Sequence, residues 1–442
     1  MGRRDPTTST PPSGRLAQVR AVADRGRPRL FGVCAVALGV LVLAGAARAV
    51  EMKLYDGSRM AVLVEGYERE TGEMTVYMSS GEEKSVRLRS VAAIYYSGRP
   101  DHFVRTGDQA FHFTAGGHIC AAVENLTKGE TLTIRSQSLG RHVISIASLH
   151  GFTALAMEGM AARRAEDLLR PDGVPDTPEN AFLDHIIDRR GVPYAGVIES
   201  FTPTRLAFEH DEQLQQVEIG TFKVAGARLA EAAKDKSHTR PGVDVLQVGV
   251  ACRDKSYVTG TLESVDPFEW RVRPNFDPGR RIHIPASEIT KVDVLGGRAV
   301  FLSQLHPVET DEQTIIAPPQ PYVMNANAQG ELMNIGGFIY HNGVGVHARS
   351  RLTFRLDGKF QAFKADVGID GRLETEGSVV FRVIGDGKVL YQSPVVRGRI
   401  SGGGLPIDVS VKDVEELTLS VDPTDDLDQA DLANWGAARV VR

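Results

Sequence analysis

The sequence lacks the short motifs by which common catalytic centres are recognised. Its 442 residues contain no G-x-S-x-G nucleophile turn, no H-E-x-x-H zinc motif, no C-x-x-C pair and no P-loop lysine motif. A glycosidase also needs two carboxylates held in a cleft, and residues 50–300 contain no recognisable catalytic domain that could provide one. We therefore predict that the protein is not an enzyme.

Cysteine is scarce, with three residues in the whole chain. Cys34 lies in an N-terminal apolar run, which leaves Cys120 and Cys252. In an exported protein these two could form one disulfide, or they could be two buried thiols on different β units. The sequence leaves both interpretations open.

The N-terminus is basic and then apolar. Residues 1–49 hold eight Arg and two Asp, and about 18 almost uninterrupted apolar residues end at Ala47-Arg48-Ala49. This order is typical of a secretory signal peptide cleaved after Ala49. An uncleaved membrane anchor is the alternative. We expect a secreted or periplasmic protein, or one of the cell envelope.

Removal of this segment makes the chain more acidic. Lys plus Arg falls from 51 to 43 and Asp plus Glu from 56 to 54, so the formal net charge changes from −5 to −11. Affinity for nucleic acid depends on clustered Lys and Arg. We therefore expect no nucleic-acid partner.

Short strand-like segments recur four times between residues 51 and 297. Taking Gly57, Gly117, Gly191 and Asp254 as equivalent turn positions, the spacings are 60, 74 and 63 residues. Five short strands bury little apolar surface alone, so bent sheets that pair with one another are expected. The pattern resembles SH3-like and Sm-like small barrels. We predict barrels at residues 50–98, 101–155, 181–230 and 242–297, with a helical linker at 156–180 between two pairs of barrels.

A new domain opens after Gly296-Gly297, and from Phe338 onward the strands are longer and alternate cleanly between apolar and polar residues. About 140 residues of this kind favour a two-sheet sandwich at residues 299–442. The predicted fold class is therefore all-β, with about four small barrels followed by a jelly-roll β-sandwich.

The stretch Gly343-Val344-Gly345-Val346-His347-Ala348 satisfies the G-x-G-x-x-[G/A] pattern of dinucleotide-binding loops. That pattern is informative only between a strand and a helix. Here Leu352, Phe354 and Leu356 alternate with polar residues, which indicates a strand. The stretch is therefore predicted to begin a sandwich strand.

Residues 300–442 resemble the NPCBM family of carbohydrate-binding modules, which are related to galactose-binding-like jelly rolls. The family typically ends in a motif like D-H-A-D-W, and here Leu432 replaces the histidine and Asn434 the second aspartate. These departures weaken a sugar site in this loop but not the fold assignment. The matching motifs are Phe301-Leu302-Ser303 with Leu305 and Pro307, Gly343 to Ala348 with Ser350, Val367-Gly368-Ile369-Asp370, Gly377 to Phe381 with Gly385-Asp386-Gly387, and Asp431-Leu432-Ala433-Asn434-Trp435.

The resemblance implies glycan binding, with galactose-type sugars as one option. Sugars are held by an aromatic face and by short polar side chains. Alternatively, Trp435 belongs to the core and His347 is structural. The candidate carbohydrate-binding residues are His341, Asn342, His347, Asp370, Asn434 and Trp435.

An acidic run near the C-terminus offers oxygen ligands suited to a structural calcium ion. It lacks the glycine and terminal glutamate of an EF-hand loop, so a solvated loop is the alternative. The candidate ligands are Asp425, Asp426, Asp428 and Asp431.

These features predict an exported, non-catalytic protein whose jelly roll binds a glycan and whose barrels act as spacer or assembly modules. The alternative is a structural module of the cell envelope that binds proteins and no sugar. Replacement of the family's histidine by Leu432 is the main support for this alternative.

Overall fold

A computed structural model describes residues 49–442. Several short segments lie outside the described residues, as does the predicted signal peptide except for its last residue. No helix among the described residues is long and apolar enough to cross a membrane. The undescribed segments after residue 48 are 56–57, 97–100, 106, 128–129, 158, 170–172, 176, 211–214, 221–222, 232–233, 235–240, 244, 314–320, 372–376, 399–403 and 425–430.

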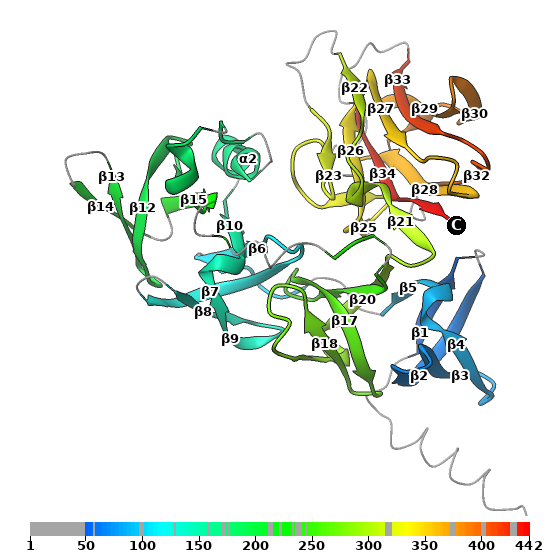
Figure 1. Ribbon diagram of the computed structural model, residues 1–442, viewed down its shortest axis with the longest axis horizontal. Coiled ribbons are helices and arrows are strands. Elements are labelled where there is room, and N and C mark those ends of the chain that lie inside the picture. Colours follow the sequence, from blue (N-terminus) through cyan, green and yellow to red (C-terminus); the bar gives the residue numbers. More distant parts are fainter. Residues whose placement is uncertain are drawn as a thin grey trace, which may run out of the picture. The chain divides into compact units, whose positions relative to one another are not determined.

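Residues 50–295 form four five-stranded antiparallel units with the same strand order (Figure 1). In each unit the first four strands form a meander, and the fifth returns to pair with the first. The all-β prediction is confirmed. The strands of the first unit are β1 (Val50–Leu54), β2 (Arg59–Glu68), β3 (Glu73–Met78), β4 (Glu83–Arg87) and β5 (Val91–Tyr95). Those of the second are β6 (Asp108–Phe113), β7 (His118–Thr127), β8 (Thr131–Ser136), β9 (Gly140–Ser145) and β10 (Leu149–Ala154).

The third and fourth units repeat this order, and single 3₁₀ turns precede several of the fifth strands. The third unit contains β11 (Asp184–Asp188), β12 (Pro193–Phe201), β13 (Arg205–His210), β14 (Gln215–Gly220) and β15 (Val224–Arg228). The fourth contains β16 (Gln247–Cys252), β17 (Tyr257–Val265), β18 (Glu269–Pro274), β19 (Ile282–Pro285) and β20 (Ile289–Leu295). The turns before fifth strands are η1 (Leu88–Ser90), η2 (Ile146–Ser148) and η6 (Ala286–Glu288), and η3 (Asn180–Phe182) precedes β11, the first strand of the third unit.

The fifth strands join the units in pairs. β5 pairs with β20, and β10 pairs with β15, so the first unit joins the fourth and the second joins the third. The linker helix α2 (Gly159–Leu168) therefore lies within the second–third pair, where Ala161, Ala165 and Leu168 pack on Ile187 and Ala225. The sequence predicted this helix but placed it between two pairs of units.

A bulge recurs in the second strand of every unit, and a glutamate occupies it each time. The register shifts past Glu65, Glu124, Glu199 and Glu263. A bulge bends the strand and redirects the side chain of the extra residue. In two units this side chain binds arginines, because Glu124 contacts Arg135 and Arg141, and Glu263 contacts Arg273 and Arg281.

Residues 299–441 form a sandwich of two antiparallel sheets, as predicted. One sheet has the order β23–β26–β34–β28–β32 with β21 beside β34, and the other β22–β27–β33–β29–β30 with β31 beside β29. The strands are β21 (Ala299–Phe301), β22 (Glu309–Glu312), β23 (Val323–Met324), β24 (Met333–Ile335), β25 (Phe338–Tyr340), β26 (Gly343–His347), β27 (Ser350–Arg355), β28 (Ala362–Ile369), β29 (Ser378–Gly385), β30 (Lys388–Gln392), β31 (Val396–Arg397), β32 (Leu405–Ser410), β33 (Glu416–Pro423) and β34 (Leu432–Val441), with the 3₁₀ turn η7 (Leu302–Gln304).

The stretch at Gly343 is strand β26, as the alternation predicted. Gly343 has φ +148°, and a Cβ at this position would lie 2.3 Å from the carbonyl oxygen of Trp435 on β34. The glycine therefore permits close contact between two neighbouring strands.

Candidate functional site

The candidate site lies on the outer face of the sheet that contains β34. Asn434 lies opposite Gly345 of β26 and Gly368 of β28. Because successive residues of a strand point to opposite faces, Asn434 points away from the core that Ala433 and Trp435 occupy. Asp370 directly follows β28 and reaches the same face.

Asp370 and Asn434 are in direct contact. Asn434 Nδ2 donates to Asp370 Oδ2 at 2.7 Å, and both residues are almost fully buried. The backbone N–H of Asn334 also donates to Asp370 Oδ2, at 3.4 Å. Among the described residues, no group donates to the buried Oδ1 of Asn434. The cluster thus joins a carboxylate, one amide side chain and a backbone N–H on one face.

The hairpin of β24 and β25 brings Asn334 to this cluster. Gly336 and Gly337 form its turn with φ +58° and +88°, conformations that favour glycine. Asn334 Oδ1 accepts from Gly337 N at 2.9 Å, and Asn334 O accepts from Gly371 N at 2.8 Å. These bonds fix the turn against the residue after Asp370.

Phe338 follows the turn and is 49% exposed. It pairs with Ile335 across the hairpin, and Ile335 is fully buried. The sequence prediction missed Phe338 as a candidate, although the Gly-Gly pair between apolar residues signals a hairpin that would display it. An exposed aromatic ring on the hairpin that contacts Asp370 offers a surface on which a sugar could stack.

The family model described as the NPCBM/NEW2 domain matches residues 298–441, which run from just before β21 to the end of β34. This segment is an NPCBM/NEW2 domain. The resemblance stated for residues 300–442 is confirmed, and the sandwich is hereafter called the NPCBM domain.

Two curated relatives match part of this chain. An enzyme of Renibacterium salmoninarum named as an endo-alpha-N-acetylgalactosaminidase is 32% identical over 160 residues, which cover 31% of this chain and 10% of the relative. Alpha-1,3-galactosidase B of Akkermansia muciniphila is 31% identical over 105 residues, covering 23% of this chain and 13% of the relative. The chain thus spans roughly a tenth of the length of these relatives.

The solved structures found by comparison include a CBM51 module from Clostridium perfringens GH95 in complex with methyl-galactose. It is 23% identical, with a TM-score of 0.29, and the match covers 32% of this chain and 99% of that one.

Two predicted site residues of the NPCBM domain lie away from the Asp370 cluster. The ring of His341 stacks on Tyr257 of β17, with 4.8 Å between centroids and 6° between planes. Asn342 Nδ2 donates to Tyr257 Oη at 3.0 Å and to Asp293 Oδ2 at 3.1 Å. His341 and Asn342 therefore hold the NPCBM domain against the fourth unit, and both are buried there.

Trp435 and His347 have structural positions. Trp435 is 1% exposed and packs edge-on against Phe381, with 5.0 Å between centroids and 90° between planes. Its ring is covered by the core and does not face a surface where a sugar could stack. His347 ends β26 opposite Leu432, is buried, and its Nδ1 lies 3.0 Å from the carbonyl oxygen of Ala348.

Most of the predicted calcium ligands lie outside the described residues, namely Asp425, Asp426 and Asp428. Asp431 is described and fully buried, and its Oδ1 accepts from Ser378 N at 2.8 Å. Within the described ranges, no three His, Cys, Asp or Glu side chains are grouped to hold a metal ion.

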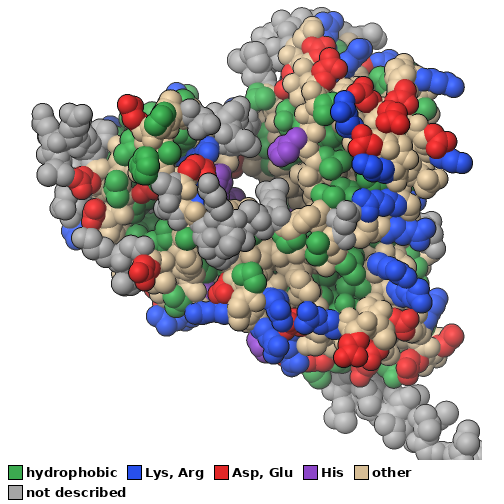
Figure 2. Space-filling model, viewed as in Figure 1, with side chains coloured by type: hydrophobic (Ala, Val, Ile, Leu, Met, Phe, Trp, Pro, Cys, Tyr) green, Lys and Arg blue, Asp and Glu red, His purple; other side chains and the backbone are tan. Residues whose placement is uncertain are grey.

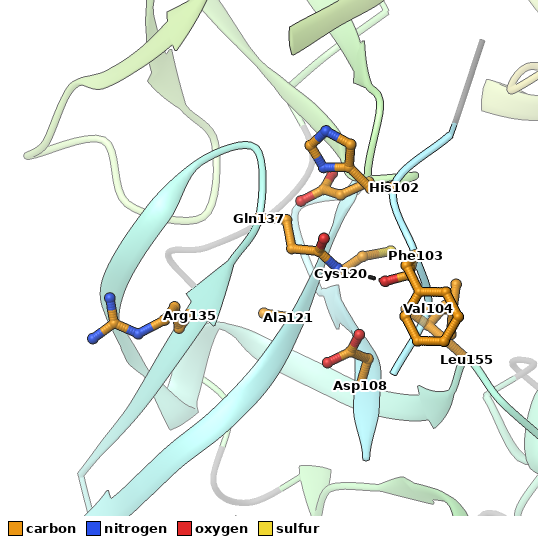
Figure 3. A pocket seen from close by; sticks show the side chains of 10 residues that line it. His102, Phe103, Val104, Asp108, Cys120, Ala121, Arg135, Gln137 and Leu155 are labelled. Carbon is orange, nitrogen blue, oxygen red and sulfur yellow. Dashed lines mark hydrogen bonds between the residues drawn. The ribbon is translucent and has the colours of Figure 1, made fainter. Parts of the chain in front are cut away.

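Cys120 and Cys252 are both buried free thiols, so the second interpretation of the cysteines describes the structure. Burial raises the pKa of each thiol well above its usual value. Cys120 borders a small cavity in the second unit, together with His102, Asp108 and Arg135 (Figure 3). The cavity volume of about 10 Å³ is room for one water molecule and excludes a sugar.

The burial of His341 predicts that the folded protein is less stable at acidic pH. Burial lowers its pKa well below 6.5, and the positive charges of Lys291 and His118 lower it further. Below about pH 6.5 the unfolded chain gains a proton that the folded His341 does not, so the free energy of unfolding falls by up to about 1.4 kcal/mol per pH unit. Urea unfolding at pH 7.5 and pH 5 measures this loss.

Because His112 and His118 shift in the same direction, the test needs a variant that removes only one histidine. His341→Phe retains a ring against Tyr257 and should show a shallower pH dependence. An unchanged slope in this variant would show that His341 is not a source of the effect.

Proposed function

We propose that the NPCBM domain binds a glycan at the Asp370 cluster and that the protein has no catalytic activity of its own. The family match over residues 298–441 carries this proposal. The exposed ring of Phe338 would cover sugar C–H groups, and the buried pair of Asp370 and Asn434 fixes the hairpin that displays this ring through the backbone N–H of Asn334.

A galactose-configured sugar is the proposed ligand. The names of both curated relatives specify a galactose-type sugar, as an N-acetylgalactosaminide in one and an α-1,3-galactoside in the other. The chain shares with them about the length of one domain. We therefore propose that this chain recognises the same type of sugar as the relatives but does not share their hydrolytic activity.

We further propose that the chain is exported, with cleavage after Ala49, and that residues 50–297 act as a rigid base for the NPCBM domain. The basic and apolar N-terminal sequence supports export. The contacts of His341 and Asn342 with the fourth unit support the role as a base.

The alternative function is a structural module of the cell envelope. The same buried contacts favour it, because they show the domain engaged in packing against protein. Leu432, in the position of the family's histidine, lies at the edge of the Asp370 cluster opposite His347 and adds an apolar group there. Stable protein complexes that persist in the presence of excess sugar would favour this alternative.

Substitution of Phe338 tests the glycan site. We expect Phe338→Ala to weaken galactoside binding about tenfold, which corresponds to about 1.4 kcal/mol of lost ring contact. Isothermal titration of residues 50–442 with methyl-galactoside and N-acetylgalactosamine measures the effect, and the thermal midpoint should stay nearly constant because Phe338 is half exposed.

The matched control is Phe103→Ala, which removes a 77% exposed ring of the second unit and should leave binding unchanged. Asp370→Asn keeps the shape and removes the charge, and it should reduce affinity by at least as much as Phe338→Ala. No binding of any galactose-type sugar by the parent protein would refute the proposal.

A further inference from the structure

A cluster of arginines lies on the surface between the first and fourth units, outside the NPCBM domain. Its centre is Glu263, the bulge residue of β17. Arg273 of β18 and Arg281, which precedes β19, each contact its carboxylate, and Arg69 of the first unit approaches Glu263 Oε1 at 3.4 Å.

The cluster carries excess positive charge. Three guanidinium groups share one carboxylate, so the group of four side chains has a net charge of +2. The Glu263 side chain is only 8% exposed, whereas those of Arg69, Arg273 and Arg281 are 53%, 36% and 64% exposed. Each guanidinium has five N–H groups, and most of them therefore remain directed toward solvent.

The comparison with the second unit separates this cluster from an ordinary structural contact. There the bulge residue Glu124 binds two arginines, Arg135 and Arg141, from the third and fourth strands. Arg273 and Arg281 occupy the matching places in the fourth unit. Arg69 is the additional member, and it comes from another unit although the carboxylate already has two partners.

The surrounding surface extends the basic area. Figure 2 shows Lys and Arg side chains gathered over β18. Arg271 lies on the same face of β18 as Arg273, because one inward-facing residue separates them. His283 of the neighbouring strand β19 lies opposite Arg271. Glu269 and Asp266 form ion pairs with Arg271 and offset its positive charge, so the unbalanced charge lies at Arg69, Arg273 and Arg281.

We propose that this arginine cluster binds the anionic groups, sulfate esters or carboxylates, of an acidic polysaccharide. Planar guanidinium groups bind tetrahedral and planar oxyanions through paired N–H donors. A single cluster in a mature chain of net charge −11 provides too few contacts for a nucleic-acid backbone. Oxyanions spaced along a polysaccharide require only such a local site. The proposal does not depend on the galactoside site.

The test compares how strongly a protein of residues 50–442 binds polymers of different charge. Dextran sulfate, polygalacturonate, neutral dextran and single-stranded DNA are immobilised, and binding is measured by biolayer interferometry at several salt concentrations. We expect one or both acidic polysaccharides to bind, with affinity that falls as salt rises, and neutral dextran not to bind. The affinity for dextran sulfate relative to that for polygalacturonate shows whether the cluster prefers sulfate esters or carboxylates.

The Arg69→Gln/Arg281→Gln variant should weaken this binding by about 30-fold, or about 2 kcal/mol, while Glu263 retains Arg273 as a partner. The control is Arg355→Gln, which changes a 63% exposed arginine of the NPCBM domain paired with Glu416 at 3.7 Å. Galactoside binding should not change in either variant. Equal binding of neutral dextran, equal loss in the control, an unaffected double variant, or stronger binding of DNA would each overturn the proposal.

Discussion

Replacement of Asp293 by Ala is expected to lower the free energy of unfolding by about 3–5 kcal/mol, because it leaves a buried charge without its partner. Lys291 Nζ lies 2.8 Å from Asp293 Oδ1, and the two side chains are 9% and 3% exposed. Burial alone would lower the pKa of Lys291, but the charge of Asp293 and the nearby Tyr95 outweigh it, and the pKa is raised. The ammonium group therefore stays charged.

Asp293 also accepts hydrogen bonds from two other elements. Its Oδ2 accepts hydrogen bonds from Tyr257 Oη at 3.2 Å and from Asn342 Nδ2 at 3.1 Å. The substitution would thus leave several buried donors unsatisfied at the junction of the fourth unit and the NPCBM domain. Faster proteolytic release of the NPCBM domain should accompany the loss of stability.

Urea unfolding measures this effect, and a double variant identifies its cause. Lys291→Met removes the charge that Asp293→Ala leaves unpaired, so the double variant should regain much of the lost stability. Lys359→Ala, which breaks a surface pair with Asp357, should cost less than about 1 kcal/mol. A loss below about 1 kcal/mol for Asp293→Ala would contradict the prediction.

Trp435→Ala should also lower the free energy of unfolding by about 3–5 kcal/mol, since it removes a large side chain from the core. Trp435 packs against Phe381 and Phe363, with 5.0 Å and 6.1 Å between ring centroids. Its strand β34 lies between β26 and β28, so the cavity would open in the middle of the sheet (Figure 1).

The comparison of stability with binding distinguishes a core role from a role in the site. At temperatures where Trp435→Phe remains folded, we expect nearly normal galactoside affinity and a smaller loss of stability than for alanine. A folded Trp435→Phe variant with no affinity would instead place the ring in the sugar site.

Local patterns in the sequence predicted the strands well. Alternation at Leu352, Phe354 and Leu356 identified a strand after the glycine-rich stretch, and the predicted turn positions Gly117 and Gly191 lie between the first two strands of the second and third units. These predictions succeed because the period of two and the turn residues depend on near neighbours.

Contacts between distant segments were not predictable in the same way. Asn342 was expected at a sugar site because it is a short polar residue in a loop, yet its partner Tyr257 is 85 residues away. Alternation identifies the two faces of a strand and does not tell which outer face another unit covers. Trp435 shows the same limit, because an aromatic residue suits both a core and a sugar site.

The order in which the units pair has a consequence during synthesis. The first unit pairs with the fourth, and the second with the third, so the pairs are nested along the chain. β5 leaves the ribosome almost 200 residues before β20, roughly 10–40 seconds earlier at a synthesis rate of about 5–20 residues per second. During this interval β5 presents an unpaired edge that can join another nascent chain. The nested order thus leaves the unpaired edge of the first unit exposed for longer than that of the second, and fusion of the first unit directly to the fourth should shorten that exposure.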